Sequence, residues 1–238
     1  GVLVRVLHSG FTSGATDDLV SQRWIMVIGF LAALTMIIGN LLALVQVRVK
    51  RLLAYSAVAN AGYLLLALVA PLDIGVGNII FYLIAYTFMT VGAFAVISLF
   101  QEGGEDADHI DNFKGLWHRR PALAAAMMVF MISMIGIPPT GGFTGKYLIF
   151  LSAMQSGHPW LAAIMGVSAV IGAGYYLRVI VAMFQEEPSN ELTKSLAVPV
   201  SAAIVIAIAV VGTMLLGVMP YLLTEPLAVI HGSLLPLS

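Results

Sequence analysis

The stretch Gly136-Ile137-Pro138-Pro139-Thr140-Gly141-Gly142 interrupts a segment, residues 121–155, whose only charged side chain is Lys146. A straight helix over this segment would be about 52 Å long, whereas the hydrocarbon core of a bilayer is about 30 Å thick. The two prolines remove two backbone donors, and the glycines favour a departure from helical backbone. The sequence therefore predicts a discontinuous helix with halves over residues 121–135 and 143–155, the helix break being formed by Gly136, Pro138, Pro139, Gly141 and Gly142.

The composition places this interrupted segment in a membrane protein. Of the 238 residues, 60% are hydrophobic and 10% are charged, whereas a soluble domain averages about 45–50% and about 25%. The net charge of -1 offers no basic footprint for nucleic acid. The sequence contains no cysteine, which excludes disulfides, thiolate zinc sites, cysteine-ligated iron–sulfur clusters and cysteine nucleophiles within it. We predict an all-α, polytopic transmembrane helix bundle.

Charge-free stretches long enough to cross a bilayer define the other predicted spans. They cover residues 24–47, 52–72, 76–100 and 198–219, and an apolar stretch whose only charge is Arg178 covers residues 160–184. We expect residues 1–9 to be the end of a truncated transmembrane helix and the start of a loop, so that the chain begins partway through a longer protein. Residues 10–184 would form a five-helix unit with its break at 136–142, and residues 185–238 a loop, the final transmembrane helix and a C-terminal tail.

Basic residues set the expected orientation. One face of the predicted bundle holds Arg48, Lys50, Arg51, Lys114, Arg119, Arg120, Arg178 and Lys194, and the opposite face holds Arg5 and Arg23. The positive-inside rule places the first face in the cytoplasm.

Lys146 is the one basic residue that this topology does not explain. A lysine at the bilayer centre costs at least about 2.5 kcal/mol, so it indicates a functional site. Burial disfavours its charged form, and the positive end of the second half-helix, in whose first turn we expect it, acts in the same direction. The alternative without a function is a lysine whose amine snorkels to the lipid headgroups. The distance of Lys146 from the outer end of the helix disfavours this alternative. We therefore predict a proton relay at Lys146.

Polar side chains in the predicted spans are candidates to hold water beside this lysine. The stronger ones are Tyr55, Asn60, Tyr86, Thr90, Thr140 and Thr144, and others are Asn40, Ser56, Thr87, Ser133, Ser168, Tyr175 and Tyr176. Taken singly, each is more often an interhelical hydrogen-bonding residue than part of a proton path. A phosphate-binding loop before Lys146 is rejected, because Tyr147 follows where such loops need serine or threonine. The histidines are dispersed, and no metal site is predicted.

Several motifs resemble those of the antiporter-like subunits of respiratory complex I, the proton-pumping NADH–quinone oxidoreductase. They are Arg48-Val-Lys50-Arg51-Leu-Leu-Ala-Tyr55-Ser56, Asp108-His-Ile-Asp-Asn-Phe-Lys114-Gly115-Leu116, Arg120-Pro121, the stretch from Gly136 to Lys146, and Tyr175-Tyr176-Leu-Arg178. The side motifs are most similar to the subunit N family. The resemblance covers nearly the whole sequence.

This resemblance implies the second of two inverted five-helix repeats, followed by a final helix, as the C-terminal half of a fourteen-helix protein. Lys146 would match the proposed relay lysine of the broken twelfth helix. Asn60 stands where many relatives carry histidine, and an amide can hold water but cannot titrate. The resemblance also implies a translocase without a redox centre in this chain. Flavin, iron–sulfur clusters and quinone would belong to partner subunits.

The expected partners are the lipid bilayer and other complex I membrane subunits, including sister antiporter-like subunits, with no nucleic acid. The location would be the bacterial inner (plasma) membrane or, alternatively, the mitochondrial inner membrane. Two other functions stay open: a subunit of a multisubunit cation/proton antiporter, and a structural spacer of the membrane arm.

Overall fold

The computed structural model describes residues 18–70, 72–100, 108–185 and 197–234. These residues form helices and no named strand, which confirms the predicted all-α class. The long helices are α2 (Asp18–Leu44), α3 (Val49–Ala67), α4 (Leu72–Ser98), α6 (Pro121–Ile135), α7 (Gly141–Gln155), α8 (Pro159–Phe184), α10 (Val200–Val218) and α11 (Tyr221–Leu234). Two short elements, η2 (Ile110–Phe113) and α5 (Leu116–Arg119), precede α6. The predicted helix end at residues 1–9 lies outside the described part of the chain.

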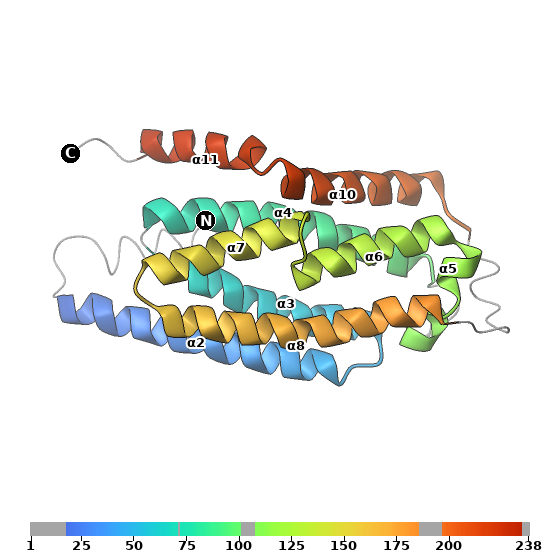
Figure 1. Cartoon of the computed structure of the whole chain (residues 1–238), viewed down its shortest axis with the longest axis horizontal. Helices are drawn as coiled ribbons and strands as arrows, with labels where there is room; N and C mark the ends of the chain where they lie inside the picture. Colours follow the sequence, from blue (N-terminus) through green and yellow to red (C-terminus); the bar gives the residue numbers. More distant parts are fainter. Residues whose placement is uncertain (1–17, 71, 101–107, 186–196, 235–238) are drawn as a thin grey trace.

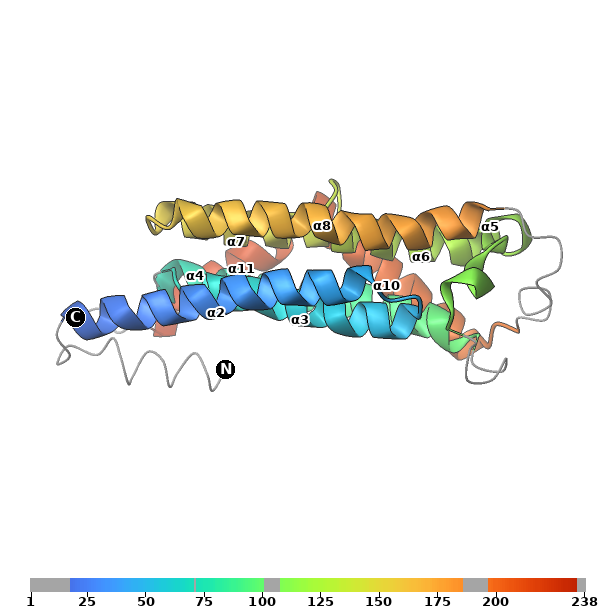
Figure 2. The ribbon, with the colours of Figure 1, turned by 90° about the horizontal axis from the view of Figure 1, so that it is seen from below.

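The helices run side by side along the long axis of the molecule (Figure 1). Figure 2 shows α6, α7 and α8 in one layer and α2 and α3 in another. Within the second layer, α2 and α3 approach each other closely at Gly39 of α2, where a Cβ atom would lie 2.5 Å from the backbone nitrogen of Ala59. Such small residues allow helix backbones to approach each other closely in membrane proteins.

Within the residues that the structure describes, four helices are long and apolar enough to cross a membrane: Arg23–Leu44, Gly75–Ser98, Pro159–Phe184 and Val200–Val218. Helix α3 is less apolar because it carries Lys50, Arg51 and Asn60, and the halves α6 and α7 are each too short to span alone. Large apolar side chains face outward, among them Phe30 (65% exposed) and Val170 (74% exposed). This exposed apolar surface is that of a multi-pass membrane protein.

Residues 108–113, which precede α5, pack against the end of the bundle at which α2 ends. Helix α2 ends at Leu44, before the predicted position 47, because the next residues pair with the segment before η2. Ile110 N donates to Val47 O at 2.9 Å, and Val49 N donates to Asp108 O at 2.8 Å. Phe113 is fully buried, with its ring centroid 4.4 Å from that of Phe100.

The C-terminal segment, predicted to be a tail, forms helix α11 in the structure. Pro220 stands just before it, and its carbonyl accepts from Leu223 N and Thr224 N, both at 3.1 Å. Proline is well tolerated at a helix start because its missing N–H has no intrahelical role there. Leu223 and Leu227 pack against the buried Phe81 of α4. Pro220 therefore both follows the span predicted to end at residue 219 and begins the next helix.

Candidate functional site: a lysine beside a helix interruption

Helices α6 and α7 follow one another end to end (Figure 1). Gly136 closes α6 with a φ of 93°, a left-handed conformation that glycine adopts without steric cost. Thr140 begins α7: its Oγ1 accepts from Phe143 N at 3.4 Å and donates to Ile137 O at 2.8 Å. This cap starts the helix at Gly141, two residues before the predicted start. The Pro138–Pro139 bond between the two caps is cis.

The interruption is tightly packed. Gly142 N donates to Ser133 Oγ at 3.1 Å, and a Cβ atom at Gly142 would lie 2.0 Å from Ser133 O. On the other side, a Cβ at Gly217 of α10 would lie 2.3 Å from Pro139 O. Glycine at these two positions therefore lets α6, α7 and α10 converge on the residues between the half-helices.

Lys146 lies on α7 with its amine directed back to the end of α6. Its side chain is buried, with 9% exposed. Nζ donates to Met134 O at 2.5 Å and to Ile135 O at 3.2 Å. Nζ also lies 5.1 Å from the ring centroid of Tyr63.

This geometry corrects the expected electrostatics of the lysine. Lys146 is in the second turn of α7, because the helix begins at Gly141. Its amine meets the C-terminal end of α6, where unpaired carbonyls carry partial negative charge and favour a cation. The positive end of α7 is therefore not the helix end that the amine contacts.

A first chain of buried polar groups begins at Tyr63 of α3. Its hydroxyl forms a 3.1 Å hydrogen bond with Ser168 Oγ of α8. Asn40 Nδ2 of α2 donates to the same Ser168 Oγ at 2.5 Å. Tyr175 Oη of α8 donates to Asn40 Oδ1 at 2.8 Å. These four side chains are each at most 2% exposed, so the bonds satisfy polar groups that have left water.

A second chain runs beside the first. The hydroxyl of Tyr82 on α4 donates to Asn60 Oδ1, and Asn60 Nδ2 donates to Ser56 O at 2.9 Å. Ser56 Oγ in turn hydrogen-bonds the hydroxyl of Tyr176 on α8. Ring contacts join the two chains at both ends: the centroids of Tyr63 and Tyr82 are 6.4 Å apart, and those of Tyr175 and Tyr176 are 4.4 Å apart.

Of the polar residues that the sequence predicted to hold water beside Lys146, only some belong to these buried chains or contact them. Asn60 is in the second chain, and Tyr86 stacks on Tyr82 with centroids 6.1 Å apart. Thr90 donates to Tyr86 O within its own helix at 2.6 Å, and both residues line a surface hollow of about 540 Å³. Tyr55 is half-buried on a different face of α3 from Asn60. Thr140 and Thr144 bond within the start of α7.

Sequence reasoning missed Tyr63 and Tyr82 as site residues. The signal was present in α3, where Ser56, Asn60 and Tyr63 follow the spacing of one helix face. Tyr82 similarly lies four residues before Tyr86 on α4. A row of polar residues along one face of an apolar helix indicates a buried polar site more strongly than any one of these residues does alone.

Comparison with known proteins identifies the family to which this architecture is similar. Residues 9–172 match the family described as NADH:quinone oxidoreductase/Mrp antiporter, TM. The chain is 41% identical over 219 residues to NADH-quinone oxidoreductase subunit N of Chloroflexus aggregans, covering 92% of this chain and 43% of that protein. It therefore spans less than half the length of that curated relative.

Solved structures of membrane complexes contain similar chains. One is in respiratory complex I from Thermus thermophilus with bound aureothin, with a TM-score of 0.75 and 36% identity over 85% of this chain and 45% of that one. Another is in the membrane-bound sulfane sulfur reductase, an archaeal respiratory complex, with a TM-score of 0.84 and 27% identity over 98% of this chain and 45% of that one. With its antiporter-like helices and the family match over most of its length, this chain belongs to the NADH:quinone oxidoreductase/Mrp antiporter transmembrane family.

Proposed function

We propose that this chain is the C-terminal half of a subunit N-type, proton-translocating membrane subunit of a NADH–quinone oxidoreductase. Within it, Lys146 takes up and releases the transported proton. The observation that carries the proposal is the buried amine of Lys146 at the interruption between α6 and α7, in contact with Tyr63. The identity to subunit N relatives supports the assignment of the complex.

The surroundings of Lys146 suit both protonation states. A neutral amine has two N–H donors, which match the two carbonyl acceptors of Met134 and Ile135. A protonated amine adds a third N–H and a positive charge. The face of the Tyr63 ring then offers an attractive site for that charge. A side chain that is accommodated in both states can exchange a proton without a large rearrangement.

The two polar chains supply a route between Lys146 and the end of the bundle that carries Arg178. Hydroxyls of Tyr63, Ser168 and Tyr175 both donate and accept, so they can pass a proton or hold a water. Asn40 and Asn60 can position such waters but cannot titrate. We propose that water also gathers at the helix interruption, where freed backbone groups need partners, so that Thr140 and Thr144 line the same path.

Electron transfer would take place in partner subunits. Those subunits would hold the flavin, iron–sulfur clusters and quinone, and this chain would lie in the bacterial inner membrane beside sister antiporter-like subunits. Residues 10–184 would act as one five-helix repeat around the interruption at 136–142. Coupling to the redox subunits would then make proton movement depend on quinone reduction.

A cation/proton antiporter subunit is the second candidate, because the matched family also covers Mrp antiporters. The same helices would then work without redox partners. Copurification of the native complex distinguishes the two: flavin- and iron–sulfur-containing subunits accompany the chain in the first case only. A purely structural spacer is disfavoured, because it gives no reason to bury Lys146.

The decisive experiment replaces Lys146 in the complete complex. Lys146→Ala removes the relay and should abolish most proton pumping in inverted membrane vesicles. Lys146→Arg keeps the charge but holds its proton, so a relay should fail while a fixed cation would be tolerated. Lys50→Arg, the same exchange in the first turn of α3, is the matched control.

Subunit content is measured in every vesicle preparation, so that a loss of assembly is not read as a loss of pumping. Lys146→Met adds a variant of similar length that needs no polar partner. If the arginine variant assembles and pumps at the wild-type rate, Lys146 is a fixed charge and the relay proposal is wrong.

A further inference from the structure

Helix α11 carries an acidic side chain at membrane depth. Leu223 and Leu227 pack against Phe81 of α4, which is fully buried. Phe81 lies six residues inside the span Gly75–Ser98, which is about 9 Å from the end of that span at the helical rise. Glu225 stands between the two leucines on α11 and therefore lies at the same depth.

This depth is within the hydrocarbon core of a bilayer. The span of α4 has 24 residues, so it is about 36 Å long and exceeds a core of about 30 Å by about 3 Å at each end. Glu225 thus lies about 6 Å beneath the outer boundary of the core. Figure 1 shows α11 alongside the first half of α4. Helix α11 begins near the level of the helix interruption, because a Cβ at Gly217 would lie 2.3 Å from Pro139 O.

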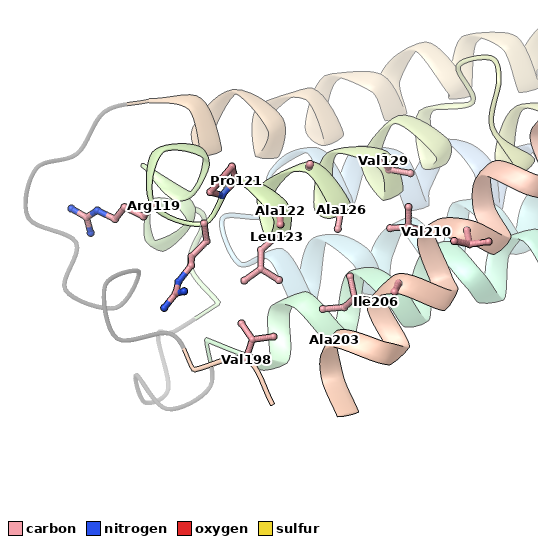
Figure 3. Close-up of a pocket in the computed structure, with 14 residues that line it drawn as sticks. Arg119, Pro121, Ala122, Leu123, Ala126, Val129, Val198, Ala203, Ile206 and Val210 are labelled. Carbon is pink, nitrogen blue, oxygen red and sulfur yellow. The ribbon is translucent and has the colours of Figure 1, made fainter. Parts of the chain in front are cut away.

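The outward side of α10 carries no comparable group. Where α10 faces α6 across a groove of about 710 Å³ (Figure 3), its lining residues are apolar: Ala203, Ile206, Ala207, Val210 and Val211. Ile208, which is 59% exposed, is apolar as well. A surface of this kind can face lipid without leaving a polar group unpaired. The exposed side of α11 is different in this respect.

Three oxygen-bearing groups lie on the exposed face of α11. Tyr221 is 50% exposed and Leu222 is 45% exposed. Glu225 is exposed too and follows these residues by four and three positions, so the three share one helix face. Pro226 stands within the helix and has no N–H, so the carbonyl of Leu222 lacks its α-helical partner. The face therefore offers a carboxylate, a phenolic hydroxyl and a free carbonyl.

Within the part of the chain that the structure describes, Glu225 has neither an ion-pair partner nor a hydrogen-bond partner. A charged side chain in hydrocarbon is costly, and such residues pair with an opposite charge or face a water-filled cavity. Helical side chains incline towards the N-terminus of their helix. Because α11 begins at mid-membrane, Glu225 inclines towards the bilayer centre and away from the outer headgroups. The carboxylate therefore needs a cationic partner at its own depth.

We propose that this face of α11 docks a transmembrane helix of another membrane subunit, which brings a lysine or arginine against Glu225. Charge complementarity selects the basic side chain, and the oxygens of Tyr221 and Leu222 accept its remaining N–H donors. Chains similar to this one occur within multisubunit membrane complexes. The inference rests on the proposed membership of such a complex, but it does not depend on proton relay by Lys146.

The test uses the intact complex with the photoreactive amino acid p-benzoylphenylalanine in place of Leu222. After irradiation in membrane vesicles, cross-linked peptides are mapped by mass spectrometry. We expect a single transmembrane segment of a different subunit, with a lysine or arginine within one helical turn of the cross-linked residue. The same amino acid in place of Ile208 is the control and should not label that segment. Cross-links to lipid only, to a second copy of this chain, or to a segment without a basic residue would overturn the proposal.

Charge variants then test the ion pair itself. Glu225→Gln removes the charge at nearly constant size and should reduce co-purification of the cross-linked subunit several-fold. Asp111→Asn is the matched control, because it removes an exposed carboxylate outside the membrane. Glu225→Lys should also lose the partner, and a glutamate at the identified basic position should restore it. Equal retention of the partner by Glu225→Gln and the wild type would overturn the proposal.

Two further results separate this inference from the proposed function. Lys146→Ala should preserve the cross-link from position 222, so a failure of the relay leaves the docking surface intact. A chain that purifies without any other subunit would overturn both the proposed assembly and the docking surface. A chain that copurifies with its partners but cross-links only to lipid would overturn the docking surface alone.

Discussion

The amine of Lys146 lies 5.1 Å from the ring centroid of Tyr63, and the hydroxyl of the same tyrosine bonds Ser168 on α8. Tyr63 therefore contacts the lysine through its ring and the buried polar residues through its oxygen. Its aromatic ring and its hydroxyl can be tested separately, because phenylalanine keeps the ring and lacks the oxygen.

Tyr63→Phe should slow proton pumping several-fold while the complex assembles normally, because the link from Lys146 to Ser168 is lost. Tyr63→Leu should be more harmful, since it also removes a ring contact with a cation that is worth about 0.5–2 kcal/mol. Pumping by inverted vesicles is measured, normalised to subunit content. Tyr55→Phe, a half-buried tyrosine on another face of α3, is the control. Wild-type pumping by Tyr63→Phe would remove the hydroxyl from the path.

Gly142→Ala should disrupt the helix interruption. The new Cβ would lie 2.0 Å from Ser133 O, so α6 and α7 must separate and the amine of Lys146 must lose its carbonyl partners. We expect a lower melting temperature of the subunit and reduced assembly. Gly166→Ala is the matched control, because a Cβ there meets nothing within 4 Å. In that helix interior the exchange should stabilise by about 0.5–1 kcal/mol. Equal behaviour of the two variants would show that the interruption tolerates a side chain.

Much of the fold could be predicted because the signals are local. The prolines and glycines at 136–142 indicate the boundary between α6 and α7, and long apolar stretches with few charges indicate most of the other long helices. Lys146 stood out because a lone charge in an apolar segment is costly. These inferences needed no knowledge of which helices are neighbours.

The contacts between helices could not be predicted in the same way. The amine of Lys146 points back towards α6, and this direction depends on how the two half-helices meet. Ser168 joins Tyr63 and Asn40 only because α2, α3 and α8 pack together. Helix α11 was missed for a different reason, since Pro220 is compatible with both the end of α10 and the start of α11.

Side-specific labelling should place α5 and the end of α7 on opposite faces of the membrane. His118 and Gln155 are exposed at these two sites, and residues 1–238 contain no cysteine. In the intact complex, with labelling read on the isolated subunit, His118→Cys should react with an impermeant maleimide only from the cytoplasmic side. Gln155→Cys should react only from the other side. Labelling of both from one side would contradict the topology on which the relay path depends.

Phe113→Ala should loosen the connection between α4 and α6. The side chain is fully buried against Phe100, and loss of a buried phenylalanine costs about 3–5 kcal/mol. We expect faster proteolysis within residues 101–120 and a lower yield of assembled complex, with Phe113→Leu intermediate. Ile208→Ala, at an exposed apolar position on α10, serves as the comparison. Unchanged proteolysis would mean that the connection is held elsewhere.

Asn60 offers the last test, because its amide holds two buried hydroxyl-bearing residues in place. Its oxygen accepts from Tyr82, and its nitrogen donates to Ser56 O at 2.9 Å and to Ser56 Oγ at 3.3 Å. Asn60→Leu removes both functions and leaves buried groups unpaired, at about 1–3 kcal/mol. Asn60→His retains one acceptor and one donor in the neutral imidazole. Pumping should therefore fall strongly in the leucine variant and persist in the histidine variant.

Asn78→Leu is the matched control: this amide also bonds a serine across helices, Ser152 Oγ at 2.6 Å, but outside the two polar chains. If Asn60→Leu and Asn78→Leu reduce assembly equally and neither slows pumping per assembled complex, the chain through Asn60 stabilises the helix bundle and carries no proton.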